Sequence, residues 1–276
     1  GNGIVAQSGG PTPVINNSVY GVIRQWLRLK GTGTLYGAFY GIKGVLQENF
    51  IDLSSQPGDI IEKLRYTPGA ALGSCRYKLK EEDYFELLQV FKKLNIRYFF
   101  YIGGNDSMDT ADRVNRLAVR EGYPLNVIGI PKTIDNDLPF TDHCPGYGSA
   151  ARYLATTVLE TGIDLKMLIN NTRVAILEVM GRNAGWLTAA AALARREDGD
   201  VPHLLCLPEV PFNEDKFAAE VERIYRERGC VYIAASEGLV DEEGNYLTAT
   251  NSKDSFGHVQ LGGLAGTLKT LVEKKT

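Results

Sequence analysis

Residues 131–137, with the sequence Pro-Lys-Thr-Ile-Asp-Asn-Asp, carry a dense set of reactive side chains. Two carboxylates, an amide, a hydroxyl and an ammonium group lie within these seven residues. Carboxylates beside a cation are suited to taking a proton from a substrate and to stabilising charge. The alternative is a capped turn, because Asp, Asn and Thr side chains readily hydrogen-bond the backbone of turns.

The segment directly before this cluster predicts where the cluster lies in the fold. Residues 126–130 (Asn-Val-Ile-Gly-Ile) are short, apolar and partly β-branched, which is typical of a buried strand. Pro131 is expected to end the strand, because proline has no N–H to donate. The polar cluster therefore follows a strand end, a common place for a site in an α/β fold.

Four further polar motifs each follow a predicted strand: residues 8–10, 103–107, 180–183 and 236–238. The first two are glycine turns that lead into predicted helices. Glycine lets backbone N–H groups approach an anion, and the helix N-terminus adds a positive dipole. Each turn alone is a weak signal, because many such turns contain Gly-Gly for packing only.

Charged residues near these turns allow two interpretations. Asp106 lies at the mouth of the second turn, where a carboxylate would repel phosphate unless a cation intervened, so it indicates Mg²⁺. Alternatively, Asp106 is the N-cap of the following helix. Arg76 and Lys78 either clamp an anion or are solvated surface cations.

The predicted elements alternate along the chain. Strands are expected at 3–7, 35–40, 97–102, 126–130, 173–179, 203–207 and 230–235, and helices at 14–30, 58–64, 83–94, 107–120, 146–161, 184–196, 215–228 and 263–275. Residues 241–245 predict a hairpin turn. This order favours an α/β fold with mostly parallel sheets and helices on both faces. Because ligands bind at strand carboxyl ends in such folds, the five motifs indicate phosphoryl transfer. Neither GxxxxGK[ST] nor GxGxxG after a strand is present, which weakens P-loop and dehydrogenase readings.

Composition narrows the class of protein. The 276 residues suffice for one large or two ordinary domains, and 44% hydrophobic with 23% charged residues is ordinary for a globular protein. A net charge of −3 gives no basic field for nucleic acid, and no apolar run approaches the length of a membrane span. Residues 1–6 lack a signal-peptide pattern. The four cysteines show no metal spacing, which indicates a reducing, cytoplasmic location, and two are expected to be buried, Cys206 and Cys230.

Taken together and in this order, the motifs resemble those of the phosphofructokinase family. The resemblance covers essentially the whole chain and rests on residues 8–10 (Ser-Gly-Gly), 103–107 (Gly-Gly-Asn-Asp-Ser), 132–137 (Lys-Thr-Ile-Asp-Asn-Asp), 180–182 (Met-Gly-Arg) and 236–238 (Ser-Glu-Gly). It implies two Rossmann-like three-layer α/β/α domains. Residues 1–143 would form a phosphoryl-donor domain with the catalytic loop, and residues 144–276 a fructose 6-phosphate domain. The family chain normally continues further, so the C-terminal part is expected to be incomplete.

The resemblance also implies a role for each matching residue. Asp135 would be the general base for the 1-hydroxyl of fructose 6-phosphate, with Thr133 and Lys132 beside the reacting groups. Donor binding would fall to Gly9, Gly10, Arg76, Gly104, Asp106 and Ser107. Sugar binding would fall to Thr133, Asp135, Asp137, Arg173, Met180, Gly181, Arg182 and Glu237. Mg²⁺ would be held by Asp106, with Asp137 as a second carboxylate. Arg173 would reach a neighbouring subunit's sugar phosphate, which implies a homodimer or homotetramer.

Two positions bear on the phosphoryl donor. ATP-dependent members usually carry Gly at the positions of Asp106 and Lys132, whereas pyrophosphate-dependent members carry Asp and Lys. A carboxylate adds bulk and charge where a nucleotide's α-phosphate would pass, and an ammonium group neutralises pyrophosphate compactly. We therefore expect pyrophosphate as donor and a reversible glycolytic reaction. The alternatives are an ATP-dependent enzyme, or a non-catalytic regulatory subunit, which Asn105 favours because the family usually has a metal-associated Asp there.

Overall fold

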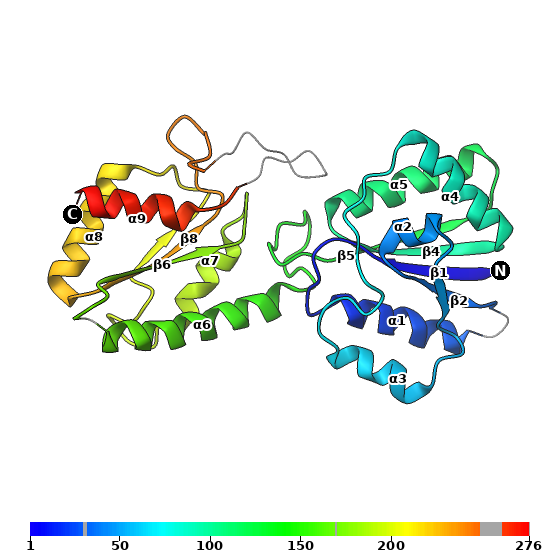
Figure 1. Cartoon of the computed structure of the whole chain (residues 1–276), viewed down its shortest axis with the longest axis horizontal. Coiled ribbons are helices and arrows are strands. Elements are labelled where there is room, and N and C mark those ends of the chain that lie inside the picture. Colours follow the sequence, from blue (N-terminus) through cyan, green and yellow to red (C-terminus); the bar gives the residue numbers. More distant parts are fainter. Residues whose placement is uncertain (30–31, 169, 249–260, 276) are drawn as a thin grey trace. The chain divides into compact units, whose positions relative to one another are not determined.

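The computed structural model describes residues 1–29, 32–168, 170–248 and 261–275, and the chain divides into two compact units, Gly1–Thr133 and Ile134–Thr276 (Figure 1). The first unit contains β1 (Asn2–Gln7), α1 (Ile15–Arg28), β2 (Leu35–Ala38), α2 (Gly41–Leu46), β3 (Phe50–Asp52), α3 (Gly58–Lys63), η1 (Leu64–Tyr66), α4 (Glu81–Lys93), β4 (Ile96–Gly103), α5 (Asn105–Arg120) and β5 (Asn126–Pro131). Its five strands are ordered β3-β2-β1-β4-β5. The β2–β1, β1–β4 and β4–β5 pairs are parallel, and β3 is antiparallel to β2.

Successive side chains along each strand point to opposite faces of the sheet, so the first unit has one hydrophobic core on each face. Along β1, Ile4 and Ala6 pack on one face of the sheet, while Val5 packs on the other. Helices α2, α4 and α5 cover the first face, and α1 and α3 cover the second (Figure 1). The first unit is therefore a three-layer α/β/α domain, as expected.

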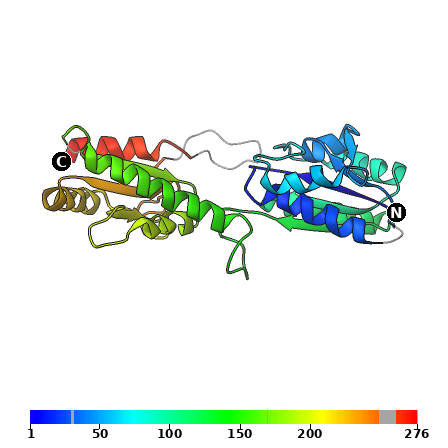
Figure 2. The same ribbon diagram turned by 90° about the horizontal axis from the view of Figure 1, so that it is seen from below.

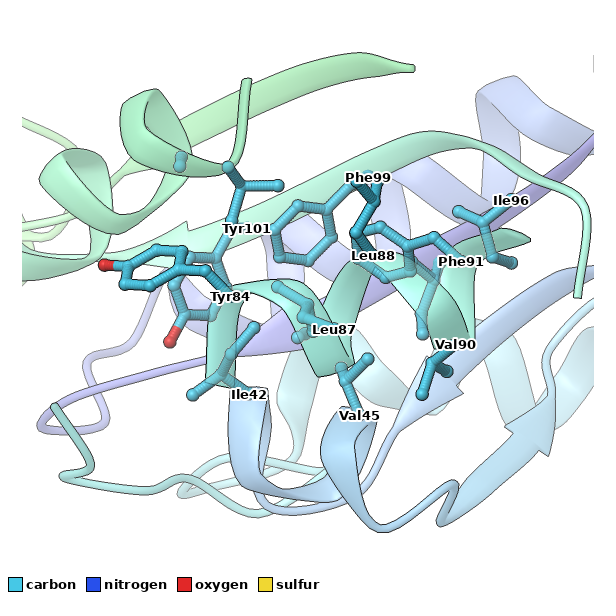
Figure 3. Packing of buried hydrophobic residues seen from close by; sticks show 14 of the residues in the cluster. Ile42, Val45, Tyr84, Leu87, Leu88, Val90, Phe91, Ile96, Phe99 and Tyr101 are labelled. Atoms are coloured by element: carbon cyan, nitrogen blue, oxygen red, sulfur yellow. The ribbon is translucent and has the colours of Figure 1, made fainter. Parts of the chain in front are cut away.

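The core between α4 and β4 is rich in aromatic rings (Figure 3). Phe91 of α4 and Phe99 of β4 are fully buried, with ring centroids 5.2 Å apart. Phe99 also stacks on Tyr101 at 5.3 Å, and α2 closes the cluster with Ile42 and Val45. Such packing holds β4, and hence the turn after it, in a fixed place.

In its described residues, the second unit repeats the layered plan with fewer strands. It contains α6 (Tyr147–Met167), β6 (Val174–Val179), α7 (Trp186–Ala190), η2 (Ala191–Ala194), β7 (Leu204–Cys206), α8 (Glu214–Arg228), β8 (Val231–Ser236) and α9 (Leu264–Lys275). Three parallel strands are ordered β6-β8-β7. Helices α6 and α7 pack on one face, and α8 and α9 on the other. Figure 2 shows α6, in green, crossing in front of these strands.

The predicted α/β class with mostly parallel sheets is confirmed, but three details differ. The β5 strand is an edge strand with exposed residues and not a buried one, because no further strand of the described residues pairs with its outer side. The predicted helix at 184–196 is a short α-helix followed by a 3-10 segment. Short elements at 41–46 and 50–52 were not predicted, and Lys30, the predicted end of the first helix, lies outside the described residues.

The division between the units falls after Thr133 and not after residue 143 as expected. Ile134 packs against the core of the second unit. Asn136 then closes the following loop, because its side chain accepts the Cys144 N–H at 2.8 Å and donates to the Asp142 carbonyl at 3.3 Å. Residues 134–143 therefore belong to the second unit.

Candidate active site

Three of the five polar motifs lie at one edge of the first sheet. The β1, β4 and β5 strands are parallel neighbours, so their carboxyl ends bring residues 8–10, 103–107 and the start of residues 132–137 together. Pro131 pairs with Gly103 as the last residue of β5, and the Lys132 N–H still donates to the Gly103 carbonyl at 3.0 Å. The strand thus ends at the predicted proline.

The first glycine turn is shaped around the Lys132 side chain. Gly9 has φ +75°, in the left-handed region that favours glycine. A Cβ added at Gly9 would lie 3.1 Å from the Lys132 Nζ atom. Lys132 is 7% exposed, so its ammonium group is held against this turn and not in open solvent. The structure therefore brings together two of the predicted residues, a turn glycine and a cation.

A loop that carries Arg76 closes over the same turn. The Cys75 carbonyl accepts the Gly9 N–H at 3.3 Å, and the Ser74 hydroxyl donates to the Gly9 carbonyl at 2.6 Å. Arg76 follows directly and is exposed. In this structure the amide of Gly9 is thus used within the protein, and Gly9 serves to shape the turn.

The second glycine turn leads directly into α5, two residues earlier than expected. Gly104 is the N-cap residue and supplies no side-chain cap. Asp106 lies in the first helical turn, half-buried, so the alternative that Asp106 is the N-cap is wrong. The N-terminus of a 16-residue helix then presents its first N–H groups and dipole at this edge of the sheet.

A buried tyrosine lies beneath both glycine turns. Tyr101 is 2% exposed, and burial raises the pKa of its phenol above the ordinary value of 10.0, while hydrogen bonds with Ser8 and Ser107 oppose the shift. Ser107 itself is 6% exposed. The phenol of Tyr101 thus connects the start of the first turn with the helix that follows the second.

Within residues 132–137, one side chain bonds the turn, and the other polar side chains differ in exposure. Asn136 is buried with φ +59° and spends its amide on the loop backbone, so the capped-turn interpretation holds for this residue. Asp135 and Thr133 are half-buried, and Asp137 is exposed. The Asp137 carboxylate is therefore open to solvent, whereas Oδ1 of Asp135 is buried, and Asn136 fixes the backbone between the two carboxylates.

The other two motifs lie at the carboxyl edge of the second sheet. The β6 and β8 strands are parallel neighbours, and the Gly181 N–H donates to Glu237 Oε1 at 3.4 Å. The Ser236 hydroxyl donates to the Gly181 carbonyl. A Cβ at Gly238 would lie 1.8 Å from the Arg182 carbonyl oxygen, so only glycine fits there. Met180 is 58% exposed beside this turn.

Arg173 is placed apart from these sugar-motif residues. It precedes β6, at the opposite end of the strand from Met180, and is exposed with its guanidinium 5.7 Å from the Tyr225 ring centroid. The second unit therefore does not bring Arg173 to its own 180–182 motif.

Comparisons with known proteins identify the family. A sequence model of the family described as phosphofructokinase matches residues 2–275. This chain belongs to the phosphofructokinase family. The resemblance drawn from the five motifs is thus confirmed at the level of the family.

Phosphofructokinases named for pyrophosphate are among the relatives. The chain is 46% identical to a pyrophosphate–fructose 6-phosphate 1-phosphotransferase of Halomonas elongata and 47% identical to one of Xanthomonas campestris, covering 99% and 100% of this chain. A solved pyrophosphate-dependent phosphofructokinase of Marinobacter aquaeolei matches with a TM-score of 0.84 at 44% identity, over 99% of this chain. The chain spans 67% of the length of each of those two relatives and 65% of the solved one.

Other predictions about this phosphofructokinase chain concern cysteines, metals and membranes. All four cysteines are free, and Cys230 is buried, while Cys206 is half-buried with its thiol pKa raised to about 11 by desolvation. Among the residues that the structure describes, no group of three or more His, Cys, Asp and Glu could hold a metal ion. Within that same part of the chain, no helix is long and apolar enough to cross a membrane.

Several residues near the candidate site were missed by sequence reasoning. Gln7 and Asn16 are buried polar side chains that bond the loop preceding Arg76, and Tyr101 lies beneath both glycine turns. Their signal was present but faint: Gln7 ends an apolar strand, and Asn16 falls within the apolar stripe of α1. A polar residue in such a stripe is informative because its burial requires hydrogen-bond partners.

Proposed function

We propose that this chain transfers a phosphoryl group from pyrophosphate to the 1-hydroxyl of fructose 6-phosphate, giving fructose 1,6-bisphosphate in a reversible step. The observation that carries the proposal is the pair of charges at the two glycine turns. The Lys132 ammonium group lies against Gly9 in the first, and Asp106 lies in the first turn of α5, directly after the second. A compact cation at a glycine turn suits a small polyanion. The names of the Halomonas and Xanthomonas relatives support the same donor.

Donor binding in this proposal uses the first unit. Gly10, Gly104 and Ser107 lie in the two turns, and the amide groups at the N-terminus of α5 face the donor phosphates. Lys132 and Arg76 neutralise negative charge, Lys132 from a buried position and Arg76 from the loop surface. Positioning and charge stabilisation are what phosphoryl transfer requires of a protein.

Sugar binding and proton transfer are assigned to the remaining motif residues. Met180, Gly181, Arg182 and Glu237 hold the sugar, and Thr133 and Asp137 bind near the acceptor hydroxyl. The 1-hydroxyl oxygen forms a bond to one phosphorus of pyrophosphate as the bridging P–O bond breaks and phosphate leaves. Asp135 takes the hydroxyl proton as general base.

The proposed reaction uses Mg²⁺, which would be held by a small number of protein ligands. In phosphoryl-transfer sites the ion is held by one or two carboxylates together with substrate phosphate oxygens. The half-buried Asp106 carboxylate at the start of α5 fits that pattern, with the exposed Asp137 as a second carboxylate. When bound, Mg²⁺ neutralises charge on the donor phosphates.

We further propose a cytoplasmic homodimer or homotetramer. Arg173 is exposed and lies away from the 180–182 motif of its own chain, which supports a role toward the sugar phosphate of a neighbouring subunit. Four free cysteines agree with a reducing compartment.

The proposal is tested by supplying the full-length protein with fructose 6-phosphate, Mg²⁺ and either pyrophosphate or ATP, and measuring fructose 1,6-bisphosphate. We expect turnover with pyrophosphate, and Asp135→Asn as the matched control is expected to lower kcat by at least about 100-fold. Turnover with ATP alone would overturn the proposed donor. No turnover with either donor would favour the regulatory-subunit alternative.

A further inference from the structure

Two buried amide side chains lie next to the first glycine turn, outside the residues given a role above. Gln7, the last residue of β1, is 0% exposed, and Asn16, in the first turn of α1, is 2% exposed. The other buried residues of α1 are apolar: Ile15, Val19, Ile23 and Trp26. A buried amide is costly unless its polar atoms are bonded, so its presence in this stripe calls for partners.

Both amides find their partners in one loop. Asn16 donates from Nδ2 to the carbonyls of Thr67 and Gly69, at 2.8 and 3.0 Å, and its Oδ1 accepts the Ala71 N–H at 2.8 Å. Gln7 Oε1 accepts the Leu72 N–H at 2.9 Å.

The two side chains are also bonded to each other. Gln7 donates from Nε2 to Asn16 Oδ1 at 2.9 Å and to the Ile15 carbonyl at 3.2 Å. Every N–H of both side-chain amides is thus used, which is the condition under which a buried polar network fixes one arrangement. We call Gln7 and Asn16 the amide clasp.

Besides the clasp, the loop is bonded near its ends: the Thr67 hydroxyl donates to the Lys63 carbonyl, and the Tyr40 N–H donates to the Leu72 carbonyl, each at 2.8 Å. Residues 67–71 are mostly exposed and lie outside helices and strands, and Gly69 and Gly73 have positive φ. Leu72 is its buried apolar anchor, at 5% exposed. The same loop continues through Ser74 and Cys75 into the bonds with Gly9.

We infer that the amide clasp is a positioning device for the phosphoryl donor: Gln7 and Asn16 fix residues 67–76 against the first glycine turn. This sets both the shape of the turn at Gly9 and the place from which Arg76 reaches the donor. The inference rests on the proposed function, because it assigns the loop to pyrophosphate and not to the sugar.

The first test is kinetic and uses isosteric changes in the full-length protein. Asn16→Asp keeps the size and the acceptor but removes both donors to the loop. We expect the KM for pyrophosphate to rise at least about tenfold, while kcat and the KM for fructose 6-phosphate change by less than about threefold. Asn17→Asp is the matched control, because Asn17 is its neighbour in α1 and, among the described residues, its side chain bonds to Pro13 and Arg65, which lie outside residues 67–76.

A second variant keeps the inference falsifiable if Asn16→Asp fails to fold. Ser74→Ala removes the bond from the far end of the loop to Gly9 at a half-buried site. It is expected to raise the KM for pyrophosphate in the same selective way. An unchanged KM for pyrophosphate in the folded variants, or an equal rise in both KM values, would overturn the inference.

A readout that needs no activity separates this inference from the proposed function. Trypsin cleaves after Arg76, and a loosened loop is cleaved faster. Asn16→Asp is expected to be cleaved there at least about five times faster than Asn17→Asp, because cleavage follows the population of the opened loop. Equal cleavage rates would overturn the clasp even in an active enzyme. Faster cleavage in a protein without pyrophosphate turnover would support the clasp as a loop restraint and overturn its assignment to the donor.

Discussion

At the scale of single residues, we expect the proposed donor preference to depend on two charges in the first unit. Lys132 lies against Gly9, and Asp106 lies in the first turn of α5. Replacing both by glycine removes a cation suited to pyrophosphate and a carboxylate that opposes a longer nucleotide. The backbone bond from Lys132 N to Gly103 O does not depend on the side chain and is retained.

The double variant Asp106→Gly/Lys132→Gly is therefore expected to shift the ratio of kcat/KM values for pyrophosphate and ATP by at least about tenfold toward ATP, or about 1.4 kcal/mol. Steady-state kinetics with each donor measures this ratio. The KM for fructose 6-phosphate serves as the internal control and should stay nearly constant. An unchanged donor ratio would show that these two charges do not select the donor.

Gly9 and Gly10 provide a matched pair for the strain in the first turn. Gly9 has φ +75° and Lys132 Nζ lies near its Cβ position, whereas a Cβ at Gly10 would meet nothing within 4 Å. Gly9→Ala is expected to destabilise the fold by at least about 1–2 kcal/mol, because an L-residue is strained in the left-handed region.

Thermal unfolding measures this difference. Gly10→Ala, as the stability control, should leave Tm within about 1–2 °C of the parent. If the two alanine variants unfolded at the same temperature, the turn geometry described for Gly9 would be incorrect.

At the scale of elements, the α4–β4 core holds in place the edge of the first sheet that carries the two glycine turns. Phe91 is fully buried in this core (Figure 3). Phe85 of the same helix is 45% exposed. Phe91→Ala is expected to cost about 3–5 kcal/mol of unfolding free energy, and Phe85→Ala less than about 1 kcal/mol.

The two tryptophans allow this to be measured for the first unit alone. Trp26 lies in the first unit and Trp186 in the second, where it is 54% exposed. In a Trp186→Phe background, urea unfolding followed by fluorescence reports Trp26. Equal losses for the two phenylalanine variants would contradict the packing described for α4.

The second sheet is expected to lose stability in mild acid through His203. Its backbone N–H donates to the Tyr232 carbonyl and its Nδ1 accepts the Tyr232 N–H, each at 2.8 Å. Burial, followed by the nearby Arg228 charge, lowers the pKa of His203 below its ordinary value of 6.5. The contribution of the neutral His203 side chain to the stability of the fold is fully present when the pH is above this ordinary pKa. It is lost as pH falls toward the folded-state pKa, because the unfolded chain takes up the proton first.

His203→Asn keeps a hydrogen-bond acceptor for Tyr232 but does not titrate in this range. Between about pH 7.5 and 5.5, the parent is expected to lose more stability than His203→Asn, as measured by Tm. Parallel pH profiles of the two proteins would contradict the assigned pKa direction.

The periodicity of apolar residues predicted the elements well where the local pattern agrees with the packing. It predicted them less well where burial depends on which elements lie next to one another in the fold. The burial of α4 and β4 follows their apolar stripes, and both lie within two residues of the predicted bounds. Residues 126–130 look like a buried strand, yet β5 is an edge strand, because strand order depends on the whole sheet. Asn105 begins α5 because Gly104 adopts the cap conformation, which composition alone does not reveal.

The candidate site was predictable in its residues but not in its connections. The glycine turns, Lys132 and the 180–182 and 236–238 motifs fall at strand ends as expected. The contact between Gly9 and Lys132, the bonds of Gln7 and Asn16, and the position of Tyr101 join residues far apart in sequence. Only the folded chain reveals such partners.

At the scale of the whole molecule, the proposed reaction is expected to be reversible. The free energies of phosphoryl transfer from pyrophosphate and from the sugar bisphosphate are similar, so we expect turnover in either direction. The reverse direction is the more direct test, because its product identifies the donor without ambiguity.

The decisive measurement is ³¹P NMR of the full-length protein with fructose 1,6-bisphosphate, phosphate and Mg²⁺, run beside a sample with ADP in place of phosphate. We expect pyrophosphate and fructose 6-phosphate to appear in the first sample and no ATP to appear in the second. Formation of ATP without any pyrophosphate would contradict this expectation.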